Sequence, residues 1–196
     1  MAKRKLPTSR RLAKTAFITA TIMWFGIGLA LFARTFLGTP FNIPTASMEP
    51  TLPVGSTVMV DKRNGHQEIK HGDVIVFRDP GGWLEDGEEE IETPFLAKRV
   101  IGLGDDIVAW DPEQGLTVNG EPVDEPYSMG SSFDEPFAIH IPEDKLWVMG
   151  DNRSHSKDSM YYYKAGKNPF VPLEMVEGRS WFVLNGTEIT QVNVED

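Results

Sequence analysis

A nineteen-residue segment without a charged residue, Thr15–Ala33, constrains this chain more than any other feature. It reads TAFITATIMWFGIGLALFA and lies between Lys14 and Arg34. As an α-helix rising 1.5 Å per residue it would extend roughly 28 Å, which is close to the thickness of the hydrocarbon core of a bilayer. A helix of this length without a polar face is disfavoured in a soluble protein. We therefore predict a single transmembrane helix over residues 15–36.

Charge is distributed unevenly on the two sides of this segment. The first fourteen residues contain six basic residues and no acidic one, and the rest of the chain contains 13 basic and 29 acidic residues, a net charge of −16 (13 − 29). Basic flanks stay in the cytoplasm, so residues 1–14 are predicted inside and residues 37–196 on the extracytoplasmic face of the cytoplasmic membrane, with its lipids as partners. An acidic body disfavours nucleic acid as a partner. A cleavable secretory signal is the alternative, but the length of the apolar run and Arg34 favour the anchor.

Short β-branched and aromatic runs separated by turn residues follow the anchor, which is typical of strands. Asn119-Gly120 predicts a hairpin, because both residues accept a positive φ. The fold class is therefore predicted as mainly β, with one N-terminal transmembrane helix followed by an antiparallel β domain. The predicted strands cover residues 56–61, 73–77, 99–103, 106–110, 116–118, 137–141, 145–149 and 180–184.

The composition limits the chemistry that is available. The chain has no cysteine, which excludes disulfides, a thiol nucleophile and zinc sites built on thiolates. His66, His71 and His140 are scattered without metal-ligand spacing, so neither a metal nor another cofactor is predicted. Six acidic residues between Glu85 and Glu92 predict an exposed loop.

Two polar residues could supply nucleophilic chemistry. Ser47 lies between Pro44 and Pro50, and the two prolines restrict the backbone around its hydroxyl. Lys98 lies beside an apolar strand, where desolvation would lower the pKa of its amine, and the neighbouring Arg99 would reinforce that effect. A neutral amine can act as a base. Taken alone, the serine also fits a solvated turn and the lysine an exposed strand end.

Four segments together carry a family resemblance. They are SMEPTL from Ser47, HGDVIVF from His71, KRVIGL from Lys98 and GDNRSHSKDS from Gly150. In order and spacing they are similar to the conserved boxes of bacterial type I signal peptidases, and the resemblance runs from the anchor to the last strand. It implies a mainly β catalytic core with a small β insertion at about residues 107–144. It also implies a serine endopeptidase that removes signal peptides from exported preproteins after small residues in an Ala-x-Ala pattern.

The resemblance also assigns roles to individual residues. Ser47 would be the nucleophile and Lys98 the general base, while the Thr45 hydroxyl and the Ser47 backbone N–H would form the oxyanion hole. Ser156 would orient the lysine amine. Asp158 would pair with arginines behind the site, and one of these would be Arg99.

The chain departs from the family pattern at several positions. Gly104-Asp105 replaces the Pro-Gly that often follows the lysine segment, and His71 stands where arginine is frequent, but neither change touches a catalytic atom. Met160 stands where family members commonly have arginine, so Asp158 would depend on Arg99 or on another cation.

Three alternatives remain open from the sequence. A serine/histidine/aspartate triad could use His155 with Asp151 or Asp158. A self-cleaving regulatory protease would use the same Ser/Lys chemistry, but it would need a DNA-binding helix-turn-helix where this chain has an apolar span. A membrane-tethered, non-enzymatic β module would leave the four ordered segments unexplained. The individual preproteins and the oligomeric state are not predicted.

Overall fold

The computed structural model describes residues 8–36, 38–62, 69–84 and 94–192, so the predicted acidic loop from Glu85 to Glu92 and His66 lie outside the described residues. The chain divides into two compact units, residues 1–38 and 39–196.

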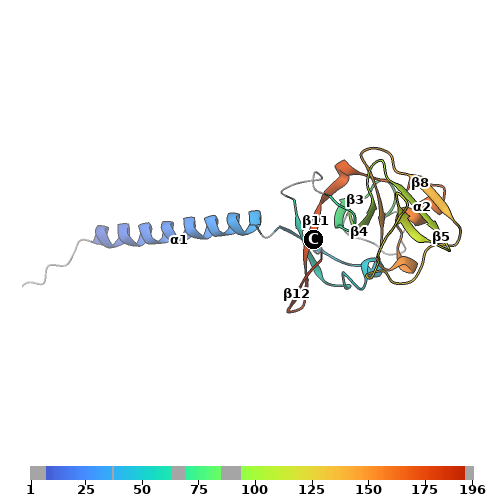
Figure 1. Ribbon diagram of the computed structural model, residues 1–196. Helices are drawn as coiled ribbons and strands as arrows, with labels where there is room; N and C mark the ends of the chain where they lie inside the picture. Colours follow the sequence, from blue (N-terminus) through green and yellow to red (C-terminus); the bar gives the residue numbers. More distant parts are fainter. Residues whose placement is uncertain (1–7, 37, 63–68, 85–93, 193–196) are drawn as a thin grey trace, which may run out of the picture. The chain divides into compact units, whose positions relative to one another are not determined.

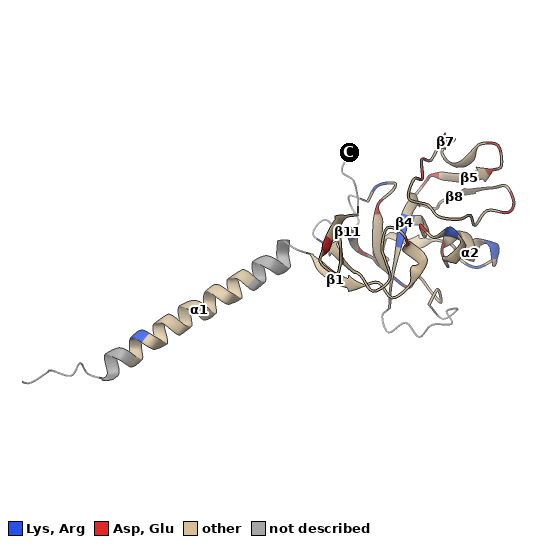
Figure 2. Ribbon diagram, turned by 90° about the horizontal axis from the view of Figure 1, so that it is seen from below, with Lys and Arg blue, Asp and Glu red and all other residues tan. Residues whose placement is uncertain are grey.

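The first unit is a single long helix, α1 (Thr8–Phe36) (Figure 1). Every side chain from Leu12 to Leu29 is exposed, and this window has a mean hydropathy of 1.5. Lys14 is its charged residue, and the described part of α1 is otherwise drawn in tan in Figure 2. The hydroxyls of Thr19 and Thr21 donate to carbonyls one turn earlier, at 3.0 and 2.9 Å, so they do not need water. By length and composition α1 could cross a membrane, and no other helix among the described residues could.

The second unit contains two antiparallel sheets. In the larger sheet the strand order is β1-β2-β11-β3-β4-β9-β10, with β12 also paired to β11. Its strands are β1 (Thr39–Asn42), β2 (Thr57–Asp61), β3 (Val74–Arg78), β4 (Phe95–Gly102), β9 (Lys145–Met149), β10 (Val171–Pro172), β11 (Val176–Asn185) and β12 (Glu188–Gln191). This confirms the predicted fold class: a mainly antiparallel β unit that follows one N-terminal apolar helix.

The smaller sheet lies within the predicted insertion and has the order β7-β6-β5-β8 (Figure 2). Its strands are β5 (Ile107–Asp111), β6 (Gly115–Val118), β7 (Glu121–Pro122) and β8 (Phe137–His140). The predicted hairpin joins β6 to β7, where Val118 pairs with Glu121. Asn119 and Gly120 have φ values of 54° and 85°, so the hairpin prediction is confirmed.

Buried side chains of β3 serve two separate apolar clusters, because successive residues of a strand project to opposite faces. Val74 and Val76 belong to a cluster formed with β1 and β2, whereas Ile75 and Phe77 belong to a cluster with Trp83 and Tyr162. A third cluster joins the smaller sheet to β9. The neighbouring strand β4 therefore also lies between two apolar layers.

Every predicted strand overlaps an observed one, and the elements that were not predicted are short. They are the strands β1, β7, β10 and β12, the six-residue helix α2 (Ser159–Lys164), and the 3₁₀ turns η1 (Ala46–Met48), η2 (Arg153–His155) and η3 (Leu173–Met175). β1 is an edge strand, which is where a residue such as Pro40 is tolerated in a sheet.

Candidate functional site

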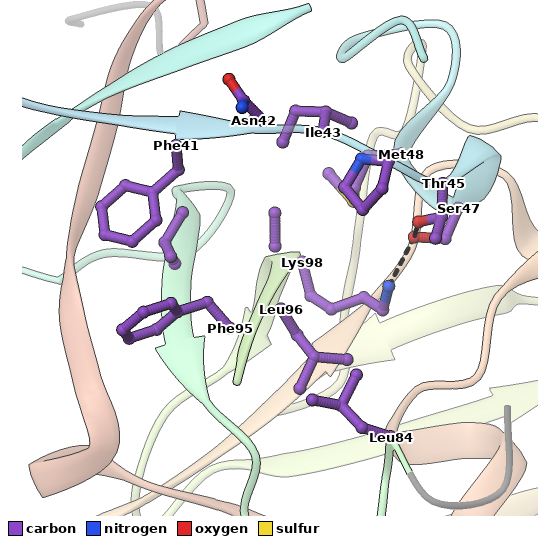
Figure 3. Close-up of a pocket in the computed structure, with 13 residues that line it drawn as sticks. Phe41, Asn42, Ile43, Thr45, Ser47, Met48, Leu84, Phe95, Leu96 and Lys98 are labelled. Carbon is purple, nitrogen blue, oxygen red and sulfur yellow. Dashed lines mark hydrogen bonds between the residues drawn. The ribbon is translucent and has the colours of Figure 1, made fainter. Parts of the chain in front are cut away.

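Ser47 is held in the middle of η1 by contacts on both sides. The buried side chains of Met48 and Leu52 fix its C-terminal flank in the first apolar cluster. From the polar loop after β9, the backbone N–H of Asn152 donates to the Ser47 carbonyl at 3.2 Å, and the Asn152 side chain donates to the Ala46 carbonyl at 3.1 Å. These bonds leave the Ser47 hydroxyl at the edge of a groove (Figure 3).

Lys98 reaches the serine from the middle of β4. It pairs with Ile75 of β3, so its stem lies on the face of the sheet that carries the cluster with Phe77 and Trp83. Only 3% of the residue is exposed. Its Nζ donates to Ser47 Oγ over 2.6 Å, and the two residues are 51 positions apart in the chain (Figure 3). The structure thus brings the two predicted catalytic residues into direct contact.

Burial controls the charge of this lysine. Desolvation lowers the pKa of the Lys98 amine from 10.5 to about 8, although the carboxylates of Asp158 and Asp151 oppose the change. An amine with this pKa is deprotonated in a substantial fraction of molecules at mildly alkaline pH. The neutral form has a lone pair available for the Ser47 proton.

Thr45 lies directly beside the serine. Its Oγ1 is 3.4 Å from Ser47 Oγ, and its backbone is extended, with φ −121° and ψ 156°. Both hydroxyls face the same groove (Figure 3).

Arg99 contacts a different carboxylate from the one predicted. Its Nε and NH2 donate to the two oxygens of Asp151 at 2.8 and 2.6 Å, and its NH1 donates to the Gly72 carbonyl at 2.7 Å. Thr51 joins the pair through its hydroxyl, 2.5 Å from Asp151. The ring of Tyr127 lies 3.8 Å from the guanidinium carbon. The prediction that Arg99 pairs with Asp158 is therefore wrong, because Asp151 binds Nε and NH2 of the guanidinium and the Gly72 carbonyl binds NH1.

Asp158 instead uses its carboxylate to hold backbone N–H groups. It accepts from Gly150 at 2.9 Å and from Met160 at 3.1 Å, and so caps the first turn of α2. Burial raises the pKa of this carboxyl, and the Gly150 N–H and the Lys98 charge oppose that rise. The Met160 side chain is buried in the third apolar cluster, in contrast to the arginine that the family pattern puts there.

Ser156 lies near the site, and its predicted role of orienting the lysine amine stays a prediction. Its buried hydroxyl lies beside the Asp158 carboxylate without meeting hydrogen-bond geometry with any described group. Its position is fixed by packing. A Cβ on Gly150 would lie 2.3 Å from Ser156 Oγ and 2.5 Å from the Ser47 carbonyl, so only glycine permits these three segments to meet.

His155 takes no part in a triad. Its Nδ1 contacts Ser154 Oγ at 3.1 Å and Asn152 Oδ1 at 3.3 Å, whereas the described partner of the Ser47 hydroxyl on the base side is Lys98. Among the described residues no three His, Cys, Asp or Glu side chains gather closely enough to hold a metal ion.

Sequence reasoning missed several residues that support the site. Asp151 and Asn152 lie in the segment GDNRSHSKDS, but their partners depend on the path that this loop takes. Tyr127 comes from the segment between β7 and β8, and no sequence signal places it over Arg99.

The groove runs between two strand edges. On one side is β1, whose pairing partner among the described strands is β2 alone. On the other side are residues 95–98 of β4, which pair with β3, while the pairing of β4 with β9 begins at Arg99. The groove is lined by Phe41, Asn42, Ile43, Pro44, Thr45, Ser47, Met48, Val76, Leu84, Phe95, Leu96, Ala97 and Lys98 (Figure 3). Its apolar walls and two free edges can accept an extended peptide.

Comparisons with known proteins agree with this arrangement. Residues 14–185 match the family described as "Signal peptidase, peptidase S26". The chain is 35% identical over 184 residues to a probable signal peptidase I of Mycobacterium leprae, a match that covers 73% of this chain and 63% of the relative. It is 32% identical over 170 residues to signal peptidase I of Bacillus amyloliquefaciens, covering 81% of this chain and 84% of that protein.

Two further matches differ in their coverage. Signal peptidase I of Mycobacterium tuberculosis is 37% identical over 169 residues, and the match spans 64% of this chain and 55% of that relative. The chain thus spans less than two thirds of the length of these mycobacterial relatives. A crystal structure of a signal peptidase I from Enterococcus faecalis V583 matches with a TM-score of 0.42 and 26% identity, over 58% of this chain and 97% of that one.

Proposed function

The chain belongs to the signal peptidase family, peptidase S26, and we propose that it is a membrane-anchored serine endopeptidase that cleaves signal peptides from exported preproteins. The observation that carries the proposal is the 2.6 Å contact between Lys98 Nζ and Ser47 Oγ, inside an apolar surrounding that favours the neutral amine. Ser47 acts as the nucleophile and Lys98 as the general base.

The first half of the reaction acylates the serine. Neutral Lys98 takes the Ser47 hydroxyl proton while Oγ attacks the scissile carbonyl carbon, and a tetrahedral intermediate forms. The protonated amine then gives this proton to the leaving nitrogen as the peptide C–N bond breaks. In the second half, water attacks the acyl-enzyme, Lys98 takes its proton, and Ser47 Oγ leaves with a proton returned by the lysine.

The oxygen of the tetrahedral intermediate carries a negative charge, which hydrogen-bond donors beside the serine would stabilise. We assign this role to the Thr45 hydroxyl and the Ser47 backbone N–H, supported by the 3.4 Å separation of the two side-chain oxygens. One such donor is typically worth about 10² to 10³ in rate. Asp158 and Ser156 support the site from behind, since Gly150 packs closely against Ser156 and the Ser47 carbonyl and donates its N–H to Asp158. Arg99 supports it through Asp151.

The substrate enters as an added strand. Its backbone hydrogen-bonds to the free edges of β1 and of residues 95–98, while its side chains enter the apolar groove. Ile43 and Ala97 both line this groove. A shallow apolar groove fits small residues at the first and third positions before the cut, which is the Ala-x-Ala pattern of signal peptides.

The helix α1 anchors the enzyme in the cytoplasmic membrane. Residues 15–36 span the bilayer and contact its lipids, and the basic residues 1–14 stay in the cytoplasm. Residues 37–196 then form the catalytic domain on the extracytoplasmic face, with residues 107–144 as its insertion. This places Ser47 a short distance along the chain from the membrane surface, where a signal peptide leaves the bilayer.

The experiment is a cleavage assay with the full chain in detergent. A preprotein with an Ala-x-Ala site is incubated with wild type, Ser47→Ala or Lys98→Ala, and any new N-terminus is mapped by mass spectrometry. We expect a cut after the second alanine by the wild type alone. Folded wild type that leaves the preprotein intact would instead support a tethered binding module, and cleavage confined to the enzyme's own chain would support a self-cleaving regulator.

A further inference from the structure

We propose that the turn Asp79–Leu84 is a positioning element for Lys98, in which Leu84 covers the lysine side chain and keeps water from its amine. The turn lies between β3 and the groove, outside the four segments that carry the family resemblance. The inference rests on the proposed function in taking Lys98 as the base.

Asp79 builds the turn with its carboxylate. Oδ1 accepts from the N–H groups of Gly81 at 3.0 Å and Trp83 at 2.9 Å, and Oδ2 accepts from Leu84 at 3.2 Å. Gly81 and Gly82 have φ values of 125° and 81°, which residues with a side chain rarely adopt. The Asp-Pro-Gly-Gly sequence thus fixes the backbone up to Leu84.

Trp83 anchors the same turn in the core. Its ring is 3% exposed and stacks on Tyr162 of α2, with centroids 4.7 Å apart and planes 12° apart. The Tyr162 hydroxyl donates to the Trp83 carbonyl at 2.9 Å, and Phe77 meets the indole edge to face. A residue held this firmly leaves its neighbour Leu84 little freedom to move.

Leu84 reaches the groove on the side of the lysine. Leu96 and Lys98 project to the same face of β4, because they are two residues apart. Figure 3 shows the side chains of Leu84 and Leu96 next to one another on one side of the Lys98 stem. Together the two leucines close an apolar wall along the lysine.

The apolar wall opposes the effect of two carboxylates on the pKa of the Lys98 amine. The negative charges of Asp158 and Asp151 favour the ammonium form of Lys98, whereas desolvation lowers the pKa of the amine and outweighs both. Removing apolar cover would admit water and restore part of the solvation of the ammonium ion. The amine would then be protonated over a wider range of pH.

The test measures the titration of Lys98 without using peptide cleavage. Full-length protein in detergent is treated with cyanate across a pH series, and carbamylation of Lys98 is quantified by mass spectrometry. We expect a wild-type midpoint of about 8. Leu84→Ala should raise the midpoint by about 0.5 to 1 pH unit, and Asp79→Ala should raise it in the same direction. Leu84→Met should restore the wild-type value.

Leu173→Ala is the matched control, because Leu173 packs, like Leu96, against the apolar cluster that contains Trp83, but Leu173 does not line the groove. It should lower thermal stability without moving the midpoint. An unchanged midpoint in folded Leu84→Ala, or an equal shift in Leu173→Ala, would overturn the proposal. If Leu84→Ala does not fold, Leu84→Val provides the same comparison with a smaller upward shift. A shift by Leu84→Ala in a chain that cleaves no preprotein would refute the proposed function alone.

Discussion

Lys98 and Arg99 are adjacent on β4 and almost equally buried, at 3% and 6% exposed. The two faces of the strand nevertheless have opposite effects on a positive charge, because one face is apolar and the other provides a carboxylate. Lys98 lies on the face with the cluster of Ile75 and Phe77, and its amine contacts the neutral hydroxyl of Ser47. On the other face, Arg99 is bound through two nitrogens to Asp151.

The difference shows how the surroundings of two adjacent cationic residues can favour a neutral amine at one of them and a structural ion pair at the other. A lysine without a direct carboxylate partner loses its proton readily when it is desolvated, whereas an arginine keeps its charge and must be paired. The pair of Arg99 with Asp151 ties β4 to the loop whose next residue, Asn152, holds the Ser47 carbonyl. Under the proposed function, one face would supply the base and the other would support the position of Ser47.

The largest expected effect comes from making position 98 permanently charged. Lys98→Arg should lower kcat as much as Lys98→Ala does, by about 10² to 10⁴, because arginine does not release a proton at working pH. Cleavage of a preprotein measures it. Lys62→Arg, at a more exposed lysine paired with Glu177, is the control and should retain activity. Substantial activity in Lys98→Arg would show that a neutral side chain is not required at position 98, and would contradict the proposed difference between the two faces.

Breaking the pair on the opposite face should destabilise the fold. Asp151→Asn leaves the buried guanidinium of Arg99 without its counter-charge and should cost about 3 to 5 kcal/mol of the free energy of unfolding. Denaturant unfolding of the full chain in detergent measures it. Arg78→Ala removes an exposed arginine that pairs with Glu177 and should change stability by less than about 1 kcal/mol. Equal losses of unfolding free energy in the two variants would mean that the buried Arg99 pair contributes no more to stability than the exposed one.

The pH dependence of activity sharpens the comparison. Because burial lowers the pKa of Lys98 to about 8, kcat/KM should rise with pH along a limb centred there as the amine loses its proton. A pH series of initial cleavage rates tests this, and a rising limb near the ordinary lysine value would contradict a desolvated base.

The smallest effect concerns the ring over Arg99. Tyr127→Leu should lower stability by about 1 to 2 kcal/mol through loss of the partly desolvated cation–π contact, whereas Tyr127→Phe should retain most of it. The comparison is Tyr161→Leu, which removes an exposed ring 5.7 Å from Lys157 and should change stability less. Thermal unfolding followed by near-UV circular dichroism ranks the three variants.

The parts of the fold that depend on local sequence pattern could be predicted from the sequence. β-branched runs such as Val74–Phe77 and the turn at Asn119-Gly120 specify strands and a hairpin without tertiary help. The strands that were missed have two to four residues, and these depend on neighbours to pair with. β1 is an example, since Pro40 weakens its pattern and β2 supplies its hydrogen bonds.

The site was predicted only in part, because some of its contacts depend on tertiary structure rather than on local sequence. Contact between Ser47 and Lys98 agrees with the roles that the family pattern assigns, and those roles stay predictions. The partner of Arg99 was predicted wrongly because Asp151 and Asp158 are seven positions apart in one polar loop. Which carboxylate meets the guanidinium depends on the path of that loop, and this path is fixed by its bond to Met129 from the segment after β7.

A direct titration of Lys98 tests the central claim most closely. Full-length protein with ¹³C-labelled lysine in detergent would be followed by NMR across a pH series, with Lys98→Arg identifying the resonance. An inflection at about 8 is the expected result, because burial without a direct carboxylate contact favours the neutral amine. An inflection near 10.5 would contradict the account, since the amine beside Ser47 would then be charged and unable to act as its base.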